Sequence, residues 1–258
     1  HRDLRKAEDR AEVAALWGVS EVPATPGKNA VDMFEAAARG QIKALWIACT
    51  NPAQSLPEQQ LVREALARCE IVVVQEAFAT TATCGFADLL LPATTWGEKE
   101  GTVTNSERRI SRVQAAIPPL GEARHDWAIL AAFGRELEAR LPAHAARYLP
   151  GTVTLFPYET AESVWLEHRA TTAGRDLDIT GLSWPMLDEK GPQQWPLREG
   201  DTQGKVRLYA DGVYPTADGK ARFAAIPYRP LAEPRESRFP FSLTTGRLRD
   251  HWHGMTRT

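Results

Sequence analysis

Residues 43–49, KALWIAC, and residues 69–75, CEIVVVQ, are two short apolar runs of the length of a buried β-strand. The second run is rich in β-branched side chains, which is typical of a strand covered on both faces. Between them, Pro57 begins a segment in which the apolar side chains of Leu61, Ala65 and Leu66 mark one face of a helix. The order strand, helix, strand predicts two parallel strands joined by a helical crossover.

Further elements of the same kind flank this unit. Residues 29–40 carry apolar side chains at helical spacing and end in a glycine, which predicts a helix. Residues 87–92, ADLLLP, are typical of a third short strand, and residues 124–141 of another amphipathic helix. Strands that alternate with helices predict the α/β class, with a mostly parallel, Rossmann-like sheet and flanking helices.

The character of the sequence changes after about residue 142. Prolines become frequent and the periodicity fades, so we expect an irregular segment. Residues 206–209 and 221–224 flank two Asp-Gly pairs, which predicts the two strands of a β-hairpin. Four prolines from Pro227 to Pro240 then predict a stiff linker into residues 241–244, the first strand of a separate domain that is cut off.

The predicted organisation therefore has three parts. They are an α/β domain over 1–142, an irregular and β-hairpin extension with its linker over 143–237, and the truncated start of another domain over 238–258. The chain begins at His1 with no initiator methionine and no signal peptide, so we expect it to be an internal fragment of a longer protein.

The composition favours a globular protein. The 258 residues include 31 Lys and Arg against 33 Asp and Glu, a formal net charge of −2, and 43% are hydrophobic. This charge gives no general attraction to nucleic acid, and no apolar run approaches the roughly 20 residues that cross a bilayer. Cys49, Cys69 and Cys84 are odd in number and form no CxxC pair, which argues against a disulfide framework or a self-contained metal site. We expect a reducing compartment and neither a nucleic-acid nor a membrane partner.

Ligands of open parallel sheets bind beyond the carboxyl ends of the strands, so the residues after each strand are candidates for function. Residues 50–55, TNPAQS, offer amide and hydroxyl groups to an anionic or nucleotide-like ligand, or form an ordinary turn and helix cap. Gln75 and Glu76 end the second strand. A carboxylate there accepts hydrogen bonds from ribose hydroxyls or a guanine edge, or is simply solvated.

Residues 96–109, WGEKEGTVTNSERR, gather charges of both signs around two glycines. Such a stretch is a solvated loop, or its Asn, Lys and paired Arg hold a phosphate or lock a loop over a cofactor. No P-loop is present, because Pro26-Gly27-Lys28-Asn29 lacks both the required upstream glycine and the following hydroxyl.

The stretch 244–257 is the richest in polar and aromatic groups. His251 and His253 have no third ligand nearby, which argues against a metal site. Positive and hydrogen-bonding groups beside the Trp252 ring favour a diphosphate next to a flat heterocycle, with a basic nucleic-acid patch as the alternative. No nucleophile and base are recognisable, and the cysteines lie in or beside predicted strands, where buried inert thiols are expected. No catalytic residue is therefore assigned.

These motifs, in this order, resemble the molybdopterin oxidoreductase family, and within it the assimilatory nitrate reductases. The resemblance covers nearly the whole chain and rests on IKALWIACTNP at 42–52, ADLLLPA at 87–93, WGEKEGTVTNSERR at 96–109, and Thr245-Gly246-Arg247 with Trp252-His253. Narrower similarity to the assimilatory nitrate enzymes comes from GRDLDITGL at 174–182 and GPQQWP at 191–196.

In that family two molybdopterin guanine dinucleotides hold one molybdenum. The resemblance implies that the α/β domain embraces one of them and that residues 238–258 are the truncated start of the molybdopterin dinucleotide-binding domain, a β-barrel. The cofactor-binding residues that it implies are Asn51, Gln75, Glu76, Lys99, Asp126, Thr245, Gly246, Arg247, His251, Trp252, His253 and Gly254. His251 departs from the Gln of many assimilatory members. The three cysteines match neither the family's [4Fe-4S] motif nor its molybdenum-ligating cysteine. We therefore expect the [4Fe-4S] cluster in a missing N-terminal part and the molybdenum ligand outside this sequence.

The resemblance implies reduction of nitrate to nitrite by oxygen-atom transfer, in the cytoplasm, with electrons from a donor protein or reductase subunit. It also implies that this polypeptide alone neither holds the cofactor tightly nor reduces nitrate. A formate dehydrogenase-like enzyme with the same cofactor is the alternative within the family. A non-catalytic nucleotide-binding module and a structural domain of a redox complex are the alternatives from other classes.

Overall fold

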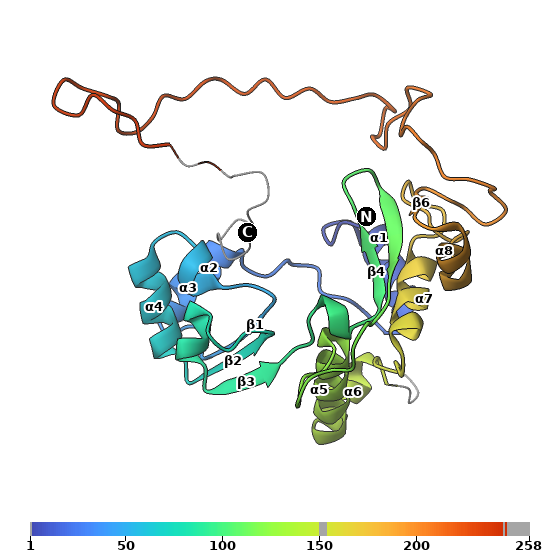
Figure 1. Ribbon diagram of the computed structural model, residues 1–258, viewed down its shortest axis with the longest axis horizontal. Coiled ribbons are helices and arrows are strands. Elements are labelled where there is room, and N and C mark those ends of the chain that lie inside the picture. Colours follow the sequence, from blue (N-terminus) through green and yellow to red (C-terminus); the bar gives the residue numbers. More distant parts are fainter. Residues whose placement is uncertain (1, 150–153, 245, 247–258) are drawn as a thin grey trace. The chain divides into compact units, whose positions relative to one another are not determined.

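The structure, a computed structural model, describes residues 2–149, 154–244 and 246 (Figure 1). Contacts divide the chain into two compact units, His1–Val206 and Arg207–Thr258. The elements of the first unit are α1 (Ala7–Trp17), α2 (Ala30–Ala38), β1 (Ala44–Ala48), α3 (Pro52–Ser55), α4 (Gln59–Arg68), β2 (Ile71–Glu76), η1 (Ala82–Phe86), β3 (Leu89–Pro92), η2 (Trp96–Glu98), β4 (Gly101–Thr104), β5 (Arg109–Val113), α5 (Asp126–Arg140), α6 (Pro142–Tyr148), α7 (Ala161–Thr171), α8 (Trp184–Lys190) and β6 (Gln193–Gln194).

Strands β1, β2 and β3 form a parallel sheet with β2 in the centre. The register between β1 and β2 runs from Ala44 opposite Ile71 to Ala48 opposite Gln75. The three predicted strands are therefore confirmed, as are the α/β class and the parallel arrangement. The helices predicted over 29–40, after Pro57 and over 124–141 are confirmed as α2, α4 and α5.

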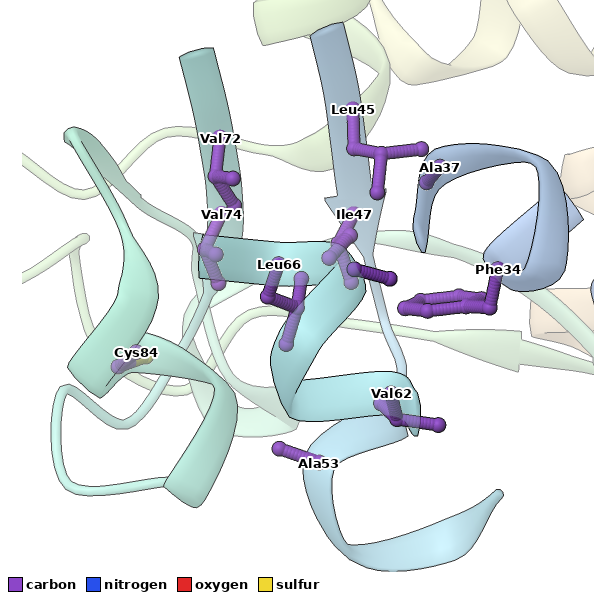
Figure 2. Packing of buried hydrophobic residues seen from close by; sticks show 11 residues of the cluster. Phe34, Ala37, Leu45, Ile47, Ala53, Val62, Leu66, Val72, Val74 and Cys84 are labelled. Carbon is purple, nitrogen blue, oxygen red and sulfur yellow. The ribbon is translucent and has the colours of Figure 1, made fainter. Parts of the chain in front are cut away.

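Helices α2, α3 and α4 lie together on one face of this sheet (Figure 1). The hydrophobic core beneath them is built by alternate strand residues and by the inner faces of the helices. Figure 2 shows its members at close range, with Phe34 and Ala37 of α2 beside Leu45 and Ile47 of β1. The residues that form this core are Phe34, Ala37, Leu45, Ile47, Ala53, Val62, Ala65, Leu66, Val72, Val74 and Cys84.

Helix α5 packs against the opposite face of the sheet. Because strand side chains alternate between faces, Trp46 and Gln75 point away from the core side that Ile47 and Val74 occupy. The ring of Trp46 meets Phe133 of α5 edge-on, with 4.8 Å between the centroids. Helix α5, which begins at Asp126, therefore contacts this face of the sheet.

The charged stretch 96–109 is largely an antiparallel hairpin, so the solvated loop is a wrong prediction. Gly101 of β4 pairs with Val113 of β5, and Thr104 pairs with Ile110; β6 adds a third strand beside β5. Ile110 is buried in a second hydrophobic core. The many charges obscured the β-branched residues that form the strands, and the strand β6 that completes the sheet is distant in sequence.

Helices also occupy the segment that we expected to be irregular. Helices α6, α7 and α8 lie there, and α7 and α8 contribute to the second core. Pro142 and Pro185 stand in the first turns of α6 and α8, where the missing proline N–H breaks no helical hydrogen bond. The residues that form this core are Ile110, Ala161, Trp165, Ile179, Leu182, Trp184, Leu187 and Leu197.

The predicted hairpin of residues 206–209 and 221–224 is wrong, since neither segment forms a strand. Val206 is 83% exposed and Phe223 is 96% exposed, and an isolated strand pair with so little burial is marginal. Residues 241–244 form no strand either. The rest of the predicted domain start, residues 245 and 247–258, lies outside the described residues, so the boundaries after 142 and 237 stay predictions.

Candidate functional site

Three of the predicted site residues converge at the carboxyl end of the parallel sheet. The amide Nε2 of Gln75 donates to Oδ1 of Asp126 over 2.7 Å. The ammonium Nζ of Lys99 donates to Oδ2 of the same carboxylate over 3.2 Å. We call Gln75, Lys99 and Asp126 the edge cluster. One carboxylate thus joins a donor from β2 to a cation from the segment before β4.

The local structure explains this convergence. Gln75 lies opposite Ala48 in the register and on the face of β2 that α5 contacts. Asp126 is the first residue of α5, where the partial positive charge of a helix N-terminus stabilises a carboxylate. Lys99 follows η2 directly and is carried to Asp126 by that turn.

An exposed aromatic ring stands beside the edge cluster. The ammonium of Lys99 lies 5.3 Å from the ring centroid of Trp96, a cation–π distance. Trp96 is 56% exposed. The ring offers a flat apolar surface next to a cation, the two features that favour a planar heterocycle with an anionic substituent.

The edge cluster has an unmet hydrogen-bond acceptor. Among the described residues, Oε1 of Gln75 is buried without a hydrogen-bond partner. A buried carbonyl oxygen without a partner costs roughly 1–3 kcal/mol, so such groups usually have a function or an absent partner. Lys99 keeps 27% of its side chain exposed, which leaves the cation accessible. The set fits a ligand that donates hydrogen bonds and carries negative charge.

Cys49 is a fourth residue at this edge, and sequence analysis missed it. It was expected to be buried and inert, but it is exposed, and its Sγ lies 3.7 Å from Oδ1 of Asp126. Desolvation, followed by the Asp126 carboxylate, raises the pKa of the Cys49 thiol above its ordinary value. The thiol is therefore protonated at neutral pH and donates to Asp126. Its position directly after β1 was the signal that could have identified it.

The other two cysteines differ from each other. Cys84 is buried in the first core, as expected of an inert thiol, and Cys69 is half-buried. Desolvation, and then the carboxylate of Asp88, raises the pKa of the Cys69 thiol.

No group of three or more His, Cys, Asp or Glu side chains suited to a metal ion is found in the part of the chain that the structure describes.

The structure does not bring Asn51 into the edge cluster. Oδ1 of Asn51 accepts hydrogen bonds from the backbone amide and the hydroxyl of Thr83, and Nδ2 donates to Gln54. Asn51 thus ties the turn after β1 to η1. Glu76 lies nearer: its carboxylate adds to the rise in the pKa of Cys49, and its Oε1 accepts from the backbone amide of Ala77.

Asn105 and the paired arginines of the hairpin hold the protein's own backbone. Oδ1 of Asn105 accepts from the amides of Glu107 and Arg109, which shapes the turn between β4 and β5. Arg108 donates to the carbonyls of Trp195, Lys205 and Val206. These contacts favour a structural role for Asn105 and Arg108.

The predicted site residues near the C-terminus lie almost entirely outside the described residues. This holds for Thr245, Arg247, His251, Trp252, His253 and Gly254. Gly246 is described, in the second unit, as an exposed residue without helix or strand structure. The cofactor contacts expected of these C-terminal residues stay predictions.

Residues 6–136 match the family model described as molybdopterin oxidoreductase. The chain belongs to that family. The matched residues contain β1, β2 and β3 together with the whole edge cluster. In this molybdopterin oxidoreductase chain, the edge cluster therefore lies within the part of the chain that the family model matches.

Relatives of this molybdopterin oxidoreductase chain are named nitrate reductase. The chain is 39% identical to the nitrate reductase of Synechocystis sp. over 100% of its own length and 35% of the relative. It is 35% identical to the assimilatory nitrate reductase catalytic subunit of Bacillus subtilis, over 98% of the chain and 34% of the relative. The chain thus spans about a third of the length of these relatives.

More distant relatives carry other names. At 32% identity the chain is similar to the periplasmic nitrate reductase of Desulfovibrio desulfuricans, over 100% of the chain and 35% of the relative. At 31% it is similar to the F420-dependent formate dehydrogenase subunit alpha of Methanocaldococcus jannaschii, over 98% and 35%. Among solved structures, acetylene hydratase from Pelobacter acetylenicus is 22% identical with a TM-score of 0.49, over 65% of this chain and 21% of that one.

None of the helices in the described ranges is long and apolar enough to cross a membrane.

Proposed function

We propose that these residues are part of a molybdenum enzyme that reduces nitrate to nitrite. The observation that carries this proposal is the 39% identity, over the whole chain, to a relative named nitrate reductase. The name of the Bacillus subtilis relative supports an assimilatory role. Nitrate is then the substrate, and the electrons come from a donor protein or reductase subunit.

The cofactor that we propose is a molybdenum bis(molybdopterin guanine dinucleotide). Its guanine and ribose donate hydrogen bonds and its diphosphate is anionic, which fits the unmet Oε1 of Gln75 and the exposed ammonium of Lys99. Asp126 and Glu76 supply further acceptors. In this arrangement Lys99 offsets diphosphate charge and Gln75 orients the heterocycle. By the family resemblance, Arg247 and His253 also offset diphosphate charge.

When bound, the molybdenum centre supplies a two-electron reduction in which nitrate, two electrons and two protons become nitrite and water. The residues of this chain bind and orient the cofactor and set the charge around it. The molybdenum ligand and a [4Fe-4S] cluster belong, in this proposal, to other parts of the longer protein. The cytoplasmic location is likewise proposed from the assimilatory similarity alone.

The decisive experiment uses the complete reading frame that contains these 258 residues. The protein is expressed with molybdate, purified, and assayed for nitrate reduction with an artificial electron donor. We expect bound molybdenum, guanine nucleotide released on acid treatment, and nitrite formation. If the protein contains molybdenum but does not reduce nitrate, the proposed substrate is wrong and the proposed cofactor stands.

Formate oxidation is the second candidate function, favoured by the relative named formate dehydrogenase. The same purified protein is assayed with formate and an artificial electron acceptor. If the protein reduces the acceptor with formate and does not reduce nitrate, formate is the substrate instead of nitrate. A protein without molybdenum that binds GDP would favour a nucleotide-binding module.

The 258-residue chain by itself gives a further test. We expect it neither to retain the cofactor after gel filtration nor to reduce nitrate, because the proposed molybdenum ligand is not among its residues. Nitrate turnover by this chain alone would contradict that expectation.

A further inference from the structure

Glu98 is a buried carboxylate that lies next to the edge cluster without belonging to it. Its residue is only 4% exposed. Oε2 accepts hydrogen bonds from the backbone amide and the hydroxyl of Thr95, each over 2.7 Å. Oε1 accepts from the backbone amide of Leu120 over 2.8 Å. Both oxygens are therefore used, and they face donors from two separate segments.

These bonds close a loop of the chain. The hairpin of β4 and β5 leaves the turn at residues 95–98 and returns to it at residues 116–120. The carbonyl of Gly97 accepts from the amides of Ala116 and Ile117, and Glu98 adds the bond to Leu120. Among the residues that make these contacts, Glu98 is the one whose side chain bonds to both segments.

The closed loop determines where Lys99 stands. Lys99 follows Glu98 in the chain. The hydrogen bonds that anchor the Glu98 carboxylate therefore also restrain the backbone at Lys99. A few residues beyond Leu120, the chain pairs again with the end of β3, since the amide of Arg124 donates to the carbonyl of Pro92. Asp126 then begins α5. Lys99 thus follows the first of the two joined segments, and Asp126 follows the second.

We propose that Glu98 is a positioning residue: its carboxylate joins Thr95 to Leu120 and thereby holds Lys99 against Asp126 in the proposed cofactor site. This inference rests on the proposed function only for the identity of the ligand. The positioning itself is a property of the chain without ligand.

The protonation state of Glu98 agrees with this role. The amide and hydroxyl of Thr95, and then the amide of Leu120, hold the pKa of Glu98 below its ordinary value of 4.5. A carboxyl whose pKa is lowered by folding stabilises the folded state above its unfolded pKa and loses this effect as the pH falls through its folded pKa. The contact is therefore fully formed at neutral pH.

The variant Glu98→Gln separates the two halves of the contact. Its amide oxygen still accepts from Thr95, as glutamine does in capping boxes. Its NH2 group then faces the N–H of Leu120, two donors that cannot bond. The variant Glu122→Gln, at an exposed position two residues after Leu120, is the matched control.

Two measurements on the 258-residue chain test the proposal. Hydrogen exchange of the Leu120 amide is expected to accelerate about tenfold in Glu98→Gln, while that of Thr95 stays near its wild-type rate. Acetylation of Lys99 is expected to accelerate roughly threefold, while that of Lys43, an exposed lysine, is unchanged. Glu122→Gln is expected to change neither rate.

An unchanged acetylation rate of Lys99 in Glu98→Gln would overturn the proposal, whether or not Leu120 is released. If Glu98→Gln does not fold, Leu120→Pro takes its place, because it removes the donor N–H and leaves Glu98 intact, at a position that follows Pro118 and Pro119 and is 67% exposed. The same rise in Lys99 acetylation is expected, and its absence overturns the proposal. A failure of the proposed function appears instead in the molybdenum and guanine content of the longer protein and leaves both rates as they are.

Discussion

Lys99 and Asp126 are 27 positions apart in the sequence and form an ion pair, with 3.2 Å between Nζ and Oδ2. Each side chain keeps about a quarter of its surface exposed, at 27% and 28%. Because the pair is neither fully solvated nor fully buried, its attraction is worth little to stability by itself. Its value lies in placing one accessible cation at the carboxyl edge of the parallel sheet.

Replacing Lys99 by glutamine is expected to weaken cofactor retention. A hydrogen bond to a charged group contributes about 1.5–3 kcal/mol, so the molybdenum and guanine retained by the longer protein after dialysis should fall about tenfold or more. Lys43→Gln is the control, because Lys43 forms an exposed ion pair with Glu70 instead. Equal retention in both variants would remove Lys99 from the proposed site.

Replacing Gln75 by glutamate is expected to destabilise the chain at pH 7 by about 2–4 kcal/mol. The residue is 1% exposed, and the new carboxylate would stand beside that of Asp126. The loss should shrink as the pH falls and the new carboxyl is protonated, because the repulsion and the desolvation act on the charged form. Urea unfolding between pH 5 and 8 measures this. Gln41→Glu, at an exposed position, should cost less than about 0.5 kcal/mol at every pH.

The thiol of Cys49 is expected to react slowly with a disulfide reagent at pH 8. Desolvation and the carboxylate of Asp126 raise its pKa, so a smaller fraction is thiolate at a given pH than for an ordinary cysteine. Asp126→Asn removes a cause of the rise and is expected to lower the pKa and speed the reaction severalfold. The measurement is made in a Cys69→Ala background, with Cys84 as the buried internal reference. A slower reaction in Asp126→Asn would contradict the assigned contact.

The second hydrophobic core is expected to contribute strongly to stability. Leu182 is fully buried within it, so Leu182→Ala should cost about 2–5 kcal/mol of unfolding free energy. Leu166→Ala changes an exposed leucine of α7 and should cost less than about 1 kcal/mol. Comparable losses in the two variants would show that the core does not form as described.

Local sequence patterns predicted the parallel sheet well. The apolar runs that became β1 and β2 pack against helices on one face, and Trp46 of β1 contacts Phe133 of α5 on the other, so their composition alone marks them as strands. The antiparallel hairpin was missed because six of the fourteen residues 96–109 are charged and only Ile110 among the strand residues of the hairpin is deeply buried. Helices α6 and α8 were missed because proline was taken as a breaker where it occupies first-turn positions.

Sequence patterns predicted the edge cluster in part. Gln75 was identified by its place at the end of a strand, Lys99 by the charged stretch 96–109 and by family resemblance, and Asp126 only by family resemblance. Cys49 was dismissed as a buried thiol. Asn51 was placed in the site by the same strand-end argument that identified Gln75, but its side chain bonds to Thr83 and Gln54. A position after a strand does not say which neighbour the side chain meets.

Amino-acid order thus specifies which segments are strands and helices, and which polar residues stand at the carboxyl ends of parallel strands, because periodicity and burial leave their mark on neighbouring positions. Tertiary packing specifies that Lys99 meets Asp126, that Cys49 is exposed beside them, and that Glu98 joins Thr95 to Leu120. Those contacts join residues far apart in sequence through the pairing of segments 92–99 and 116–126 and the docking of α5 on the sheet. No local pattern records a contact whose partner is set by the folding of the chain as a whole.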